Sequence, residues 1–378
     1  MILRKIYRLI FNICLVVLSF LIRRKTVKVV PETVKRILII NIYSGFGEML
    51  MSTPMIAETR RIFKHSKIDC LVGSKWSEEV LENNPNLTAV YLRTSENVNM
   101  LRKNEYDIVF CLNTGIKNIF FAWGFKHKVL SGIDTNSAGF LLNYKFKRVP
   151  RDKIHEVDSY LGVIRSMGFS VRNNIGMEIY LSESEVKSYE NKYGDVGSSS
   201  DRIVLFASCS ENVSIDLLSL KNLSLDKYIS LVEHLLTKHE VCLIGGKNDI
   251  AFVRKIEDAF FDKSRLKNYC GEFTLRETAI FLKKSRVLIT NDSGPMHLAA
   301  AVKTKTITFF GPTDYETLMP LVGEHIAIYA HDECRPDEKW TKGNCRPCHL
   351  SHFPSTIINC KSRDCMCKIE VGDVLKVI

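Results

Sequence analysis

Short apolar runs rich in β-branched residues alternate with longer amphipathic stretches along most of the chain. A parallel strand that is covered on both faces is typically a continuous apolar run, and the crossover helix between two such strands is amphipathic. The strands predicted on this basis are 36–41, 68–72, 89–92 and 108–112 in the first half of the chain, and 203–207, 240–244, 286–290 and 306–310 in the second half. This alternation predicts an α/β protein with a parallel sheet in each half.

The alternation is interrupted at residues 190–202, where Gly, Ser, Asn and Asp are concentrated. A stretch of this composition is typical of a linker. Because the 378 residues are about twice the length of a usual compact domain, two domains are expected. We predict an N-terminal Rossmann-like domain over 36–185 and a C-terminal Rossmann-like domain over 203–378, facing each other across a cleft.

The N-terminal residues 1–30 form a hydrophobic and basic segment. Residues 9–22 are almost wholly apolar, and the residues that flank them are basic: Arg4, Lys5, Arg8, Arg23, Arg24 and Lys25. A helix over 9–22 would rise about 21 Å, which is shorter than the hydrocarbon core of about 30 Å. We predict that it lies in the interface of an anionic leaflet. A helix docked on the protein's own surface is the alternative, and a signal peptide is disfavoured because no small-x-small cleavage site follows.

Composition and charge narrow the function only partly. The chain is 46% hydrophobic and 25% charged, which excludes a largely disordered, collagen-like or coiled-coil protein. A net charge of +11 favours an anionic partner: nucleic acid, a lipid surface or a phosphorylated substrate. A basic stretch with interleaved aromatic residues, 144–153, is either a solvated face or a contact for an anionic acceptor or for lipid headgroups.

A glycine-rich turn follows the first predicted strand. It contains Gly45, Gly47 and Glu48, and a helical pattern begins at once. The dinucleotide-binding fingerprint would need a third glycine where this chain has Leu50, so a nicotinamide or flavin enzyme is disfavoured. Glu48 would lie at the carboxyl end of the sheet, where ligands collect in open α/β folds. The alternative is that its carboxylate only stabilises the N-terminus of the helix.

A second turn of chemical interest follows the strand 286–290. Asp292, Ser293 and Gly294 precede Pro295, which is typical of the first turn of a helix. The N-terminus of such a helix presents free N–H groups and a positive dipole end to a phosphate, and Gly294 would let a diphosphate approach closely. His297 lies one turn into the helix. The alternative is that these residues only cap the helix.

Half of the twelve cysteines lie in the last 45 residues of the chain. The scattered ones lie mainly in apolar runs and are typical of buried thiols in a reducing compartment. Within the C-terminal group, Cys345, Cys348, Cys360 and Cys365 have a spacing that permits a structural zinc site.

Three motifs together resemble glycosyltransferase family 9, the lipopolysaccharide heptosyltransferases, over residues 36–375. The first is the strand 37–41 followed by Gly47-Glu48 and Thr53-Pro54. The second runs from Asp292 to Ala300, and the third is Phe310-Gly311-Pro312-Thr313. The resemblance implies a GT-B fold and an inverting transfer, without a required cofactor or metal, from a nucleotide-sugar donor, ADP-heptose, to a lipid-linked surface glycan such as lipopolysaccharide core. Together with the hydrophobic and basic N-terminal segment, this predicts a place at the cytoplasmic face of the inner membrane and no nucleic-acid partner.

The resemblance also assigns roles to residues. Glu48 would be the catalytic base, and Gly45 and Gly47 would form the turn at the acceptor. The donor site would comprise Lys221, Asp292, Ser293, Gly294 and His297.

The chain departs from the family pattern at three places. Glu48 replaces the usual Asp, Leu223-Ser224 replaces Trp-Pro, and residues 208–212 lack the usual Pro-Gly and basic character. A transferase with a different donor sugar, and a non-catalytic protein that binds a nucleotide sugar or acts in assembly, are therefore the alternatives.

Overall fold

A computed structural model describes residues 24–43, 45–135, 139–148, 154–194, 201–208, 221–329 and 364–378. The chain forms two compact units. The first consists of the residues up to Gly45 together with Ser52–Asn173, and the second consists of Phe46–Met51 together with Asn174–Ile378.

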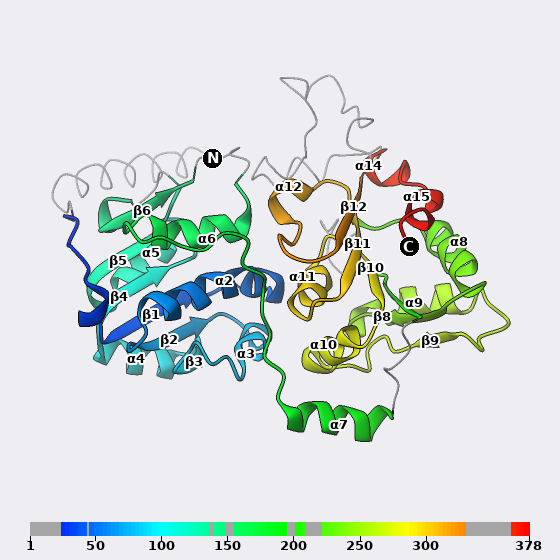
Figure 1. Ribbon diagram of the computed structural model, residues 1–378, viewed down its shortest axis with the longest axis horizontal. Helices are drawn as coiled ribbons and strands as arrows, with labels where there is room; N and C mark the ends of the chain where they lie inside the picture. Colours follow the sequence, from blue (N-terminus) through cyan, green and yellow to red (C-terminus); the bar gives the residue numbers. More distant parts are fainter. Residues whose placement is uncertain are drawn as a thin grey trace, which may run out of the picture. The chain divides into compact units, whose positions relative to one another are not determined.

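The first unit contains a parallel sheet in the order β3-β2-β1-β4-β5-β6. Its strands are β1 (Arg36–Asn41), β2 (Lys67–Val72), β3 (Ala89–Leu92), β4 (Glu105–Cys111), β5 (Lys126–Asp134) and β6 (Tyr144–Lys147). Its helices are α2 (Phe46–Ile62), whose first six residues group with the second unit, α3 (Lys75–Leu81), α4 (Ser95–Lys103), α5 (Ile116–Trp123) and α6 (Glu156–Arg165), with short 3₁₀ turns η1 (Pro31–Thr33) and η2 (Gly139–Leu141). Figure 1 shows helices on both faces of this sheet.

The second unit contains a parallel sheet in the order β12-β11-β10-β7-β8-β9. Its strands are β7 (Arg202–Phe206), β8 (Glu240–Ile244), β9 (Leu266–Asn268), β10 (Val287–Asn291), β11 (Lys305–Phe310) and β12 (His325–Tyr329). Its helices are α7 (Glu183–Tyr193), α8 (Leu225–Leu236), α9 (Ile250–Glu257), α10 (Leu275–Lys283), α11 (Gly294–Ala301), α12 (Tyr315–Leu318), α14 (Asp364–Cys367) and α15 (Val371–Leu375), with a 3₁₀ turn η4 (Lys247–Asp249).

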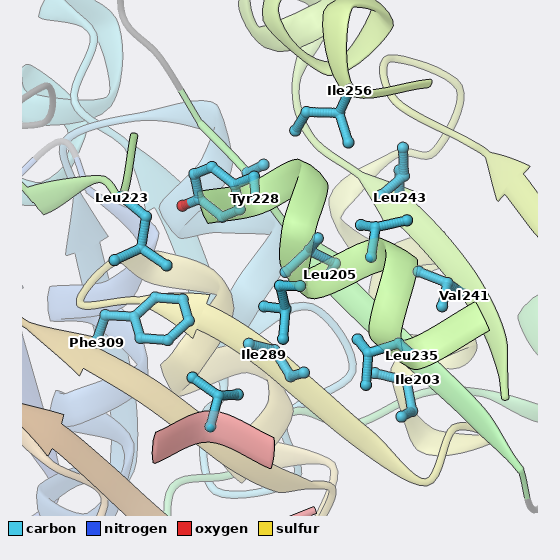
Figure 2. Close-up of a cluster of buried hydrophobic side chains, with 14 of the residues drawn as sticks. Ile203, Leu205, Leu223, Tyr228, Leu235, Val241, Leu243, Ile256, Ile289 and Phe309 are labelled. Atoms are coloured by element: carbon cyan, nitrogen blue, oxygen red, sulfur yellow. The ribbon is translucent and has the colours of Figure 1, made fainter. Parts of the chain in front are cut away.

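The core of the second unit explains why its strands are apolar throughout. Side chains from β7, β8, β10 and β11 pack together with side chains from α8 and α9, as Figure 2 shows. Each of the labelled residues is buried: Ile203, Leu205, Leu223, Tyr228, Leu235, Val241, Leu243, Ile256, Ile289 and Phe309. Helices cover both faces of a central strand, so both sets of its alternating side chains are buried. Each large apolar side chain buried in this way contributes about 1.5–3 kcal/mol to the free energy of folding.

The predicted pair of parallel-sheet α/β folds is confirmed, and all the strands predicted from apolar runs are present. Four strands were not predicted: β5, β6, β9 and β12. Strand β6 lies at the edge of its sheet and alternates half-buried and exposed residues, so it has no continuous apolar run. The domain bounds 36–185 and 203–378 stay predictions. Helix α7 extends into the predicted linker 190–202, and residues 195–200 lie outside the described part.

The predicted membrane-associating segment falls mostly on residues 1–23, which lie outside the described part of the chain. Among the residues that the structure describes, no helix is both long enough and apolar enough to cross a bilayer.

A buried carboxylate fixes the C-terminal half of α2 to the chain that leaves the first unit. Glu58 has no exposed side-chain surface and accepts hydrogen bonds from the side chain of Arg61 and from both the backbone and the side chain of Arg172. Burial by itself would raise the pKa of Glu58, but these bonds outweigh it and lower the pKa below its ordinary value. The carboxylate is therefore charged and fully paired at neutral pH.

We expect Glu58→Gln to lower the free energy of unfolding by about 2–3 kcal/mol, because both arginines lose a charged partner that is buried. Glu78→Gln is the matched control, since Glu78 pairs with the exposed Lys75 and should cost less than about 0.5 kcal/mol. Urea unfolding followed by circular dichroism measures both variants. Equal losses in the two variants would contradict the structural role of Glu58.

Candidate functional site

The order of strands in the second sheet creates a place for a ligand beyond its carboxyl ends. Strand β7 leads outward to β8 and β9, whereas its neighbour β10 leads outward in the other direction to β11 and β12. At such a topological switch point the loops after the two strands diverge, and ligands of open α/β folds bind in the opening. Ser208 lies in the loop after β7. Asn291 is the last residue of β10, and Asp292 follows it.

Helix α11 starts at this switch point. Ser293 is its N-cap residue, Gly294 is its first residue, and a proline stands in the first turn, as predicted. The Ser293 hydroxyl donates to the Asn291 side-chain oxygen (2.5 Å) and does not cap the helix. The first N–H groups of α11 therefore keep the partial positive charge of the helix end.

Lys221 and Asp292 form an ion pair next to this helix end. Lys221 Nζ donates to Asp292 Oδ2 (2.8 Å) and to the Asp292 carbonyl oxygen (3.1 Å). The exposed fractions of the two side chains are 15% and 4%. Burial alone would raise the pKa of Asp292, but the charge and the hydrogen bond of Lys221 outweigh it, with smaller contributions from Thr313 and His297, so the pKa lies below its ordinary value. The pair stays ionised at neutral pH.

A series of hydrogen bonds that sequence reasoning missed connects three loops at the site. Asn291 Nδ2 donates to Asn222 Oδ1 (2.5 Å), and the Asn222 amide donates to the Ser208 carbonyl. The Ser208 hydroxyl donates to Asp249 Oδ1 (2.7 Å), and Asp249 Oδ2 accepts from the Gly246 N–H (2.8 Å). The sequence did contain a signal for this: two consecutive glycines follow β8, and Asn222 comes directly after Lys221. These bonds hold the loops after β7, β8 and β10 in one arrangement.

The structure brings together most of the predicted donor-site residues. Lys221 and Asp292 are in direct contact, Ser293 and Gly294 begin α11, and the buried His297 lies near the Asp292 carboxylate. Their roles in binding stay predictions.

The residues predicted at the first turn lie at the start of α2. Gly45 is the N-cap residue, Gly47 is buried, and Glu48 is exposed in the first turn. Residues 46–51 group with the second unit, whereas Gly45 groups with the first. The catalytic role of Glu48 stays a prediction.

Two predicted features fall mainly outside the described residues. Of the four cysteines considered for zinc, only Cys365 is described, and it is buried. Within the described part of the chain, no group of three or more metal-ligating side chains comes together. Residues 209–212, where the chain departs from the family's phosphate segment, also lie outside that part.

The model of glycosyltransferase family 9 (heptosyltransferase) matches residues 97–345. Lipopolysaccharide heptosyltransferase 3 of Escherichia coli is 23% identical over 312 residues, which cover 76% of this chain and 86% of that protein.

Two solved structures share the fold. The family 9 glycosyltransferase of Veillonella parvula has a TM-score of 0.70 at 18% identity, covering 93% of this chain and 97% of that one. The ADP-heptose lipopolysaccharide heptosyltransferase II of Escherichia coli has a TM-score of 0.63 at 20% identity, covering 85% and 98%. The predicted GT-B fold class is thereby confirmed.

We expect Lys221→Met to lower the free energy of unfolding by about 3 kcal/mol, because it leaves the Asp292 carboxylate buried without its cation. In the double variant Lys221→Met/Asp292→Asn, the loss of unfolding free energy should be smaller than the sum of the losses in the two single variants, by about 1–3 kcal/mol. The ion pair stabilises the folded state fully at pH values above 3.8, the ordinary pKa of an aspartate. This contribution is lost as the pH falls below 3.8 and through the lower pKa of Asp292 in the folded state. The defect of Lys221→Met should therefore shrink at acidic pH.

Urea unfolding at pH 7 and at a pH well below 3.8 measures these differences. Lys376 and Asp373 supply a control cycle, since both side chains of that pair are largely exposed and their coupling should be below about 0.5 kcal/mol. Additive losses for Lys221 and Asp292 would show that the ion pair contributes nothing to folding.

Proposed function

The chain belongs to glycosyltransferase family 9, and on that premise we propose that it is an inverting transferase that moves heptose from ADP-heptose to a lipid-linked surface glycan. The observation that carries this proposal is the ionised pair of Lys221 and Asp292 beside the uncapped N-terminus of α11. The names of the relatives support the choice of sugar and acceptor, since they specify ADP-heptose and lipopolysaccharide.

The donor's diphosphate would bind at the N-terminus of α11. The helix end offers N–H groups. The ring of Phe46 packs on Gly294, so a phosphate would reach these N–H groups beside that ring. An ammonium group has three N–H donors, and Lys221 directs two to Asp292. The third is available for a phosphate oxygen. Because Lys221 and the helix end would together donate hydrogen bonds to the diphosphate, we propose that no metal is obligatory.

In the proposed reaction, Glu48 takes the proton of the acceptor hydroxyl while that oxygen attacks the anomeric carbon. The bond between this carbon and the diphosphate oxygen breaks on the opposite side, so the configuration inverts and ADP leaves. Negative charge grows on the leaving diphosphate, and Lys221 with the N–H groups of α11 would stabilise it. Asp292 would act as a positioning residue that holds the lysine, and His297 and Ser293 would complete the donor site.

The proposed place of reaction is the cytoplasmic face of the inner membrane. The apolar sequence 9–22 with its basic flanks and the net charge of +11 support a peripheral association with an anionic leaflet. A lipid-linked acceptor would be presented at that surface.

The departures from the family pattern sustain a second candidate function. A non-catalytic protein that binds a nucleotide sugar would keep the site on α11 but would not need a base, and Glu48 stands where the family usually has Asp. Substitution of Glu48 and direct measurement of ligand binding separate the two candidates.

We expect Glu48→Gln to lower kcat for sugar transfer by about 10²–10⁴-fold, because the amide cannot accept the proton. The binding of ADP to this variant should stay as in the parent protein. Glu48→Asp is the matched variant, since it keeps a carboxylate and restores the residue typical of the family. Transfer at the parent rate by Glu48→Gln would remove the catalytic role of Glu48, and no transfer by the parent with any acceptor would favour the binding protein.

A thermal-shift series would test the donor. ADP and ADP-heptose should raise the melting temperature, because a ligand present at a hundred times its Kd stabilises the folded state by about 2.7 kcal/mol. UDP- and GDP-sugars at the same concentration should have little effect, and Lys221→Met should weaken the response to ADP. A shift with UDP- or GDP-sugars alone would change the donor but not the proposed mechanism.

A further inference from the structure

The residues that follow the hydrophobic N-terminal sequence are fixed to one edge of the first sheet. We call residues 24–28 the strap. The Arg24 N–H donates to the Phe140 carbonyl (3.4 Å), Asn143 Nδ2 donates to the Lys25 carbonyl (2.8 Å), and the Tyr144 hydroxyl donates to the Val27 carbonyl. Phe140 lies in η2, Asn143 directly precedes β6, and Tyr144 is the first residue of β6, which is an edge strand of the sheet (Figure 1).

The attachment reaches into the sheet itself. Asn143 is buried, and its Oδ1 accepts from the Leu130 N–H in β5 (2.9 Å), while its own N–H donates to the Leu130 carbonyl (2.8 Å). The side chain of Asn143 therefore holds the strap with one end and β5 with the other. The strap has a defined position on the first unit, which determines where the hydrophobic N-terminal sequence joins it.

Two basic segments that are more than a hundred residues apart in the sequence meet at this edge. The strap carries the exposed Lys25 and Lys28, and β6 carries the exposed Lys145 and Lys147. Phe146, which lies between the two lysines of β6, packs against Gly162 of α6, where an added Cβ would clash with its ring. Since side chains alternate along a strand, Lys145 and Lys147 point to the other face.

These four lysines have no ion-pair partner among the described residues, whereas Arg148, directly after β6, pairs with Glu156. Lysines on an edge strand also prevent two sheets from pairing edge to edge. That explanation accounts for Lys145 and Lys147, but it does not account for the strap, which brings further positive charge to the same edge.

We propose that the strap and β6 together form the surface by which the first unit binds the headgroups of anionic phospholipids. The proposal deepens the membrane location given under the proposed function, because it names the surface. Lysines next to a membrane-associating segment are attracted by an anionic leaflet, by about a factor of five in affinity for each lysine. Because the strap is hydrogen-bonded at β6, the lysines of β6 come to the leaflet whenever the N-terminal sequence does.

The experiment compares two pairs of substitutions in the full chain. Lys145→Gln/Lys147→Gln removes two charges from β6. Lys238→Gln/Lys267→Gln removes two exposed lysines from the second unit, and Lys267 lies in β9, the edge strand of that sheet. Binding is measured by co-sedimentation with vesicles of phosphatidylcholine alone and with vesicles that also contain a quarter of phosphatidylglycerol.

The β6 pair should bind the anionic vesicles about tenfold less tightly or worse, and the control pair should change binding less than about twofold. Binding to the neutral vesicles should be the same for all. Hydrogen exchange of the parent protein on anionic vesicles should show protection of 24–28 and 144–147 relative to free protein. Equal losses of vesicle binding in both double variants would show that only the net charge of the protein matters and would overturn the proposal. Unchanged binding by the β6 double variant would overturn it as well.

A second readout separates this surface from the acceptor site. Transfer to a water-soluble acceptor without lipid should be unchanged in the β6 pair, because these lysines are outside the proposed catalytic site. A raised KM for a phosphorylated soluble acceptor, with vesicle binding intact, would assign the lysines to the acceptor and overturn the proposal. Failure of the parent to transfer any sugar would contradict the proposed function alone, since vesicle binding is measured without substrate.

Discussion

The covering of both faces of each central strand is the constraint on which the rest of this molecule depends. In β1, β7 and β10 both alternating sets of side chains are withdrawn from water, so these strands offer no exposed face for polar chemistry. The polar side chains of these strands therefore lie near the strand ends, at Arg36 and Arg202 at the amino ends and at Asn41, Thr290 and Asn291 at the carboxyl ends. Asn291, Asp292 and Ser208 lie there because the strands before them are apolar.

The buried negative charge of Asp292 needs an opposite charge close to it. Asp292 is almost fully buried, and a carboxylate there would be costly without Lys221, which supplies an opposite charge and two hydrogen bonds. Asn222, the next residue, connects the same loop to the ends of β7 and β10. The same residues thus hold the loops in place around the N-terminus of α11.

The parts of this fold that sequence could predict are those whose burial is uniform. The strand 36–41 and the helix start at Gly294 follow from a continuous apolar run and from a proline after polar capping residues. Strand β6 could not be found in this way, because one of its faces is exposed and its lysines resemble a solvated loop. The pairing of Lys221 with Asp292 joins residues 71 positions apart, and only the tertiary fold determines such a contact. The family resemblance identified both residues, but it did not reveal the hydrogen bonds by which Asn222 and Asp249 hold the adjoining loops.

The hydrogen bonds of the strap also have a consequence for synthesis on the ribosome. The two side chains that hold Lys25 and Val27 are 118 and 117 residues further along the chain, in and next to the last strand of the first sheet. At about 5–20 residues per second, the ribosome needs of the order of ten seconds to make this interval. The N-terminal sequence therefore emerges and meets its surroundings well before the edge that will hold its strap has been translated. The order of synthesis gives a membrane the first opportunity to capture that sequence, and the sheet closes on the strap afterwards.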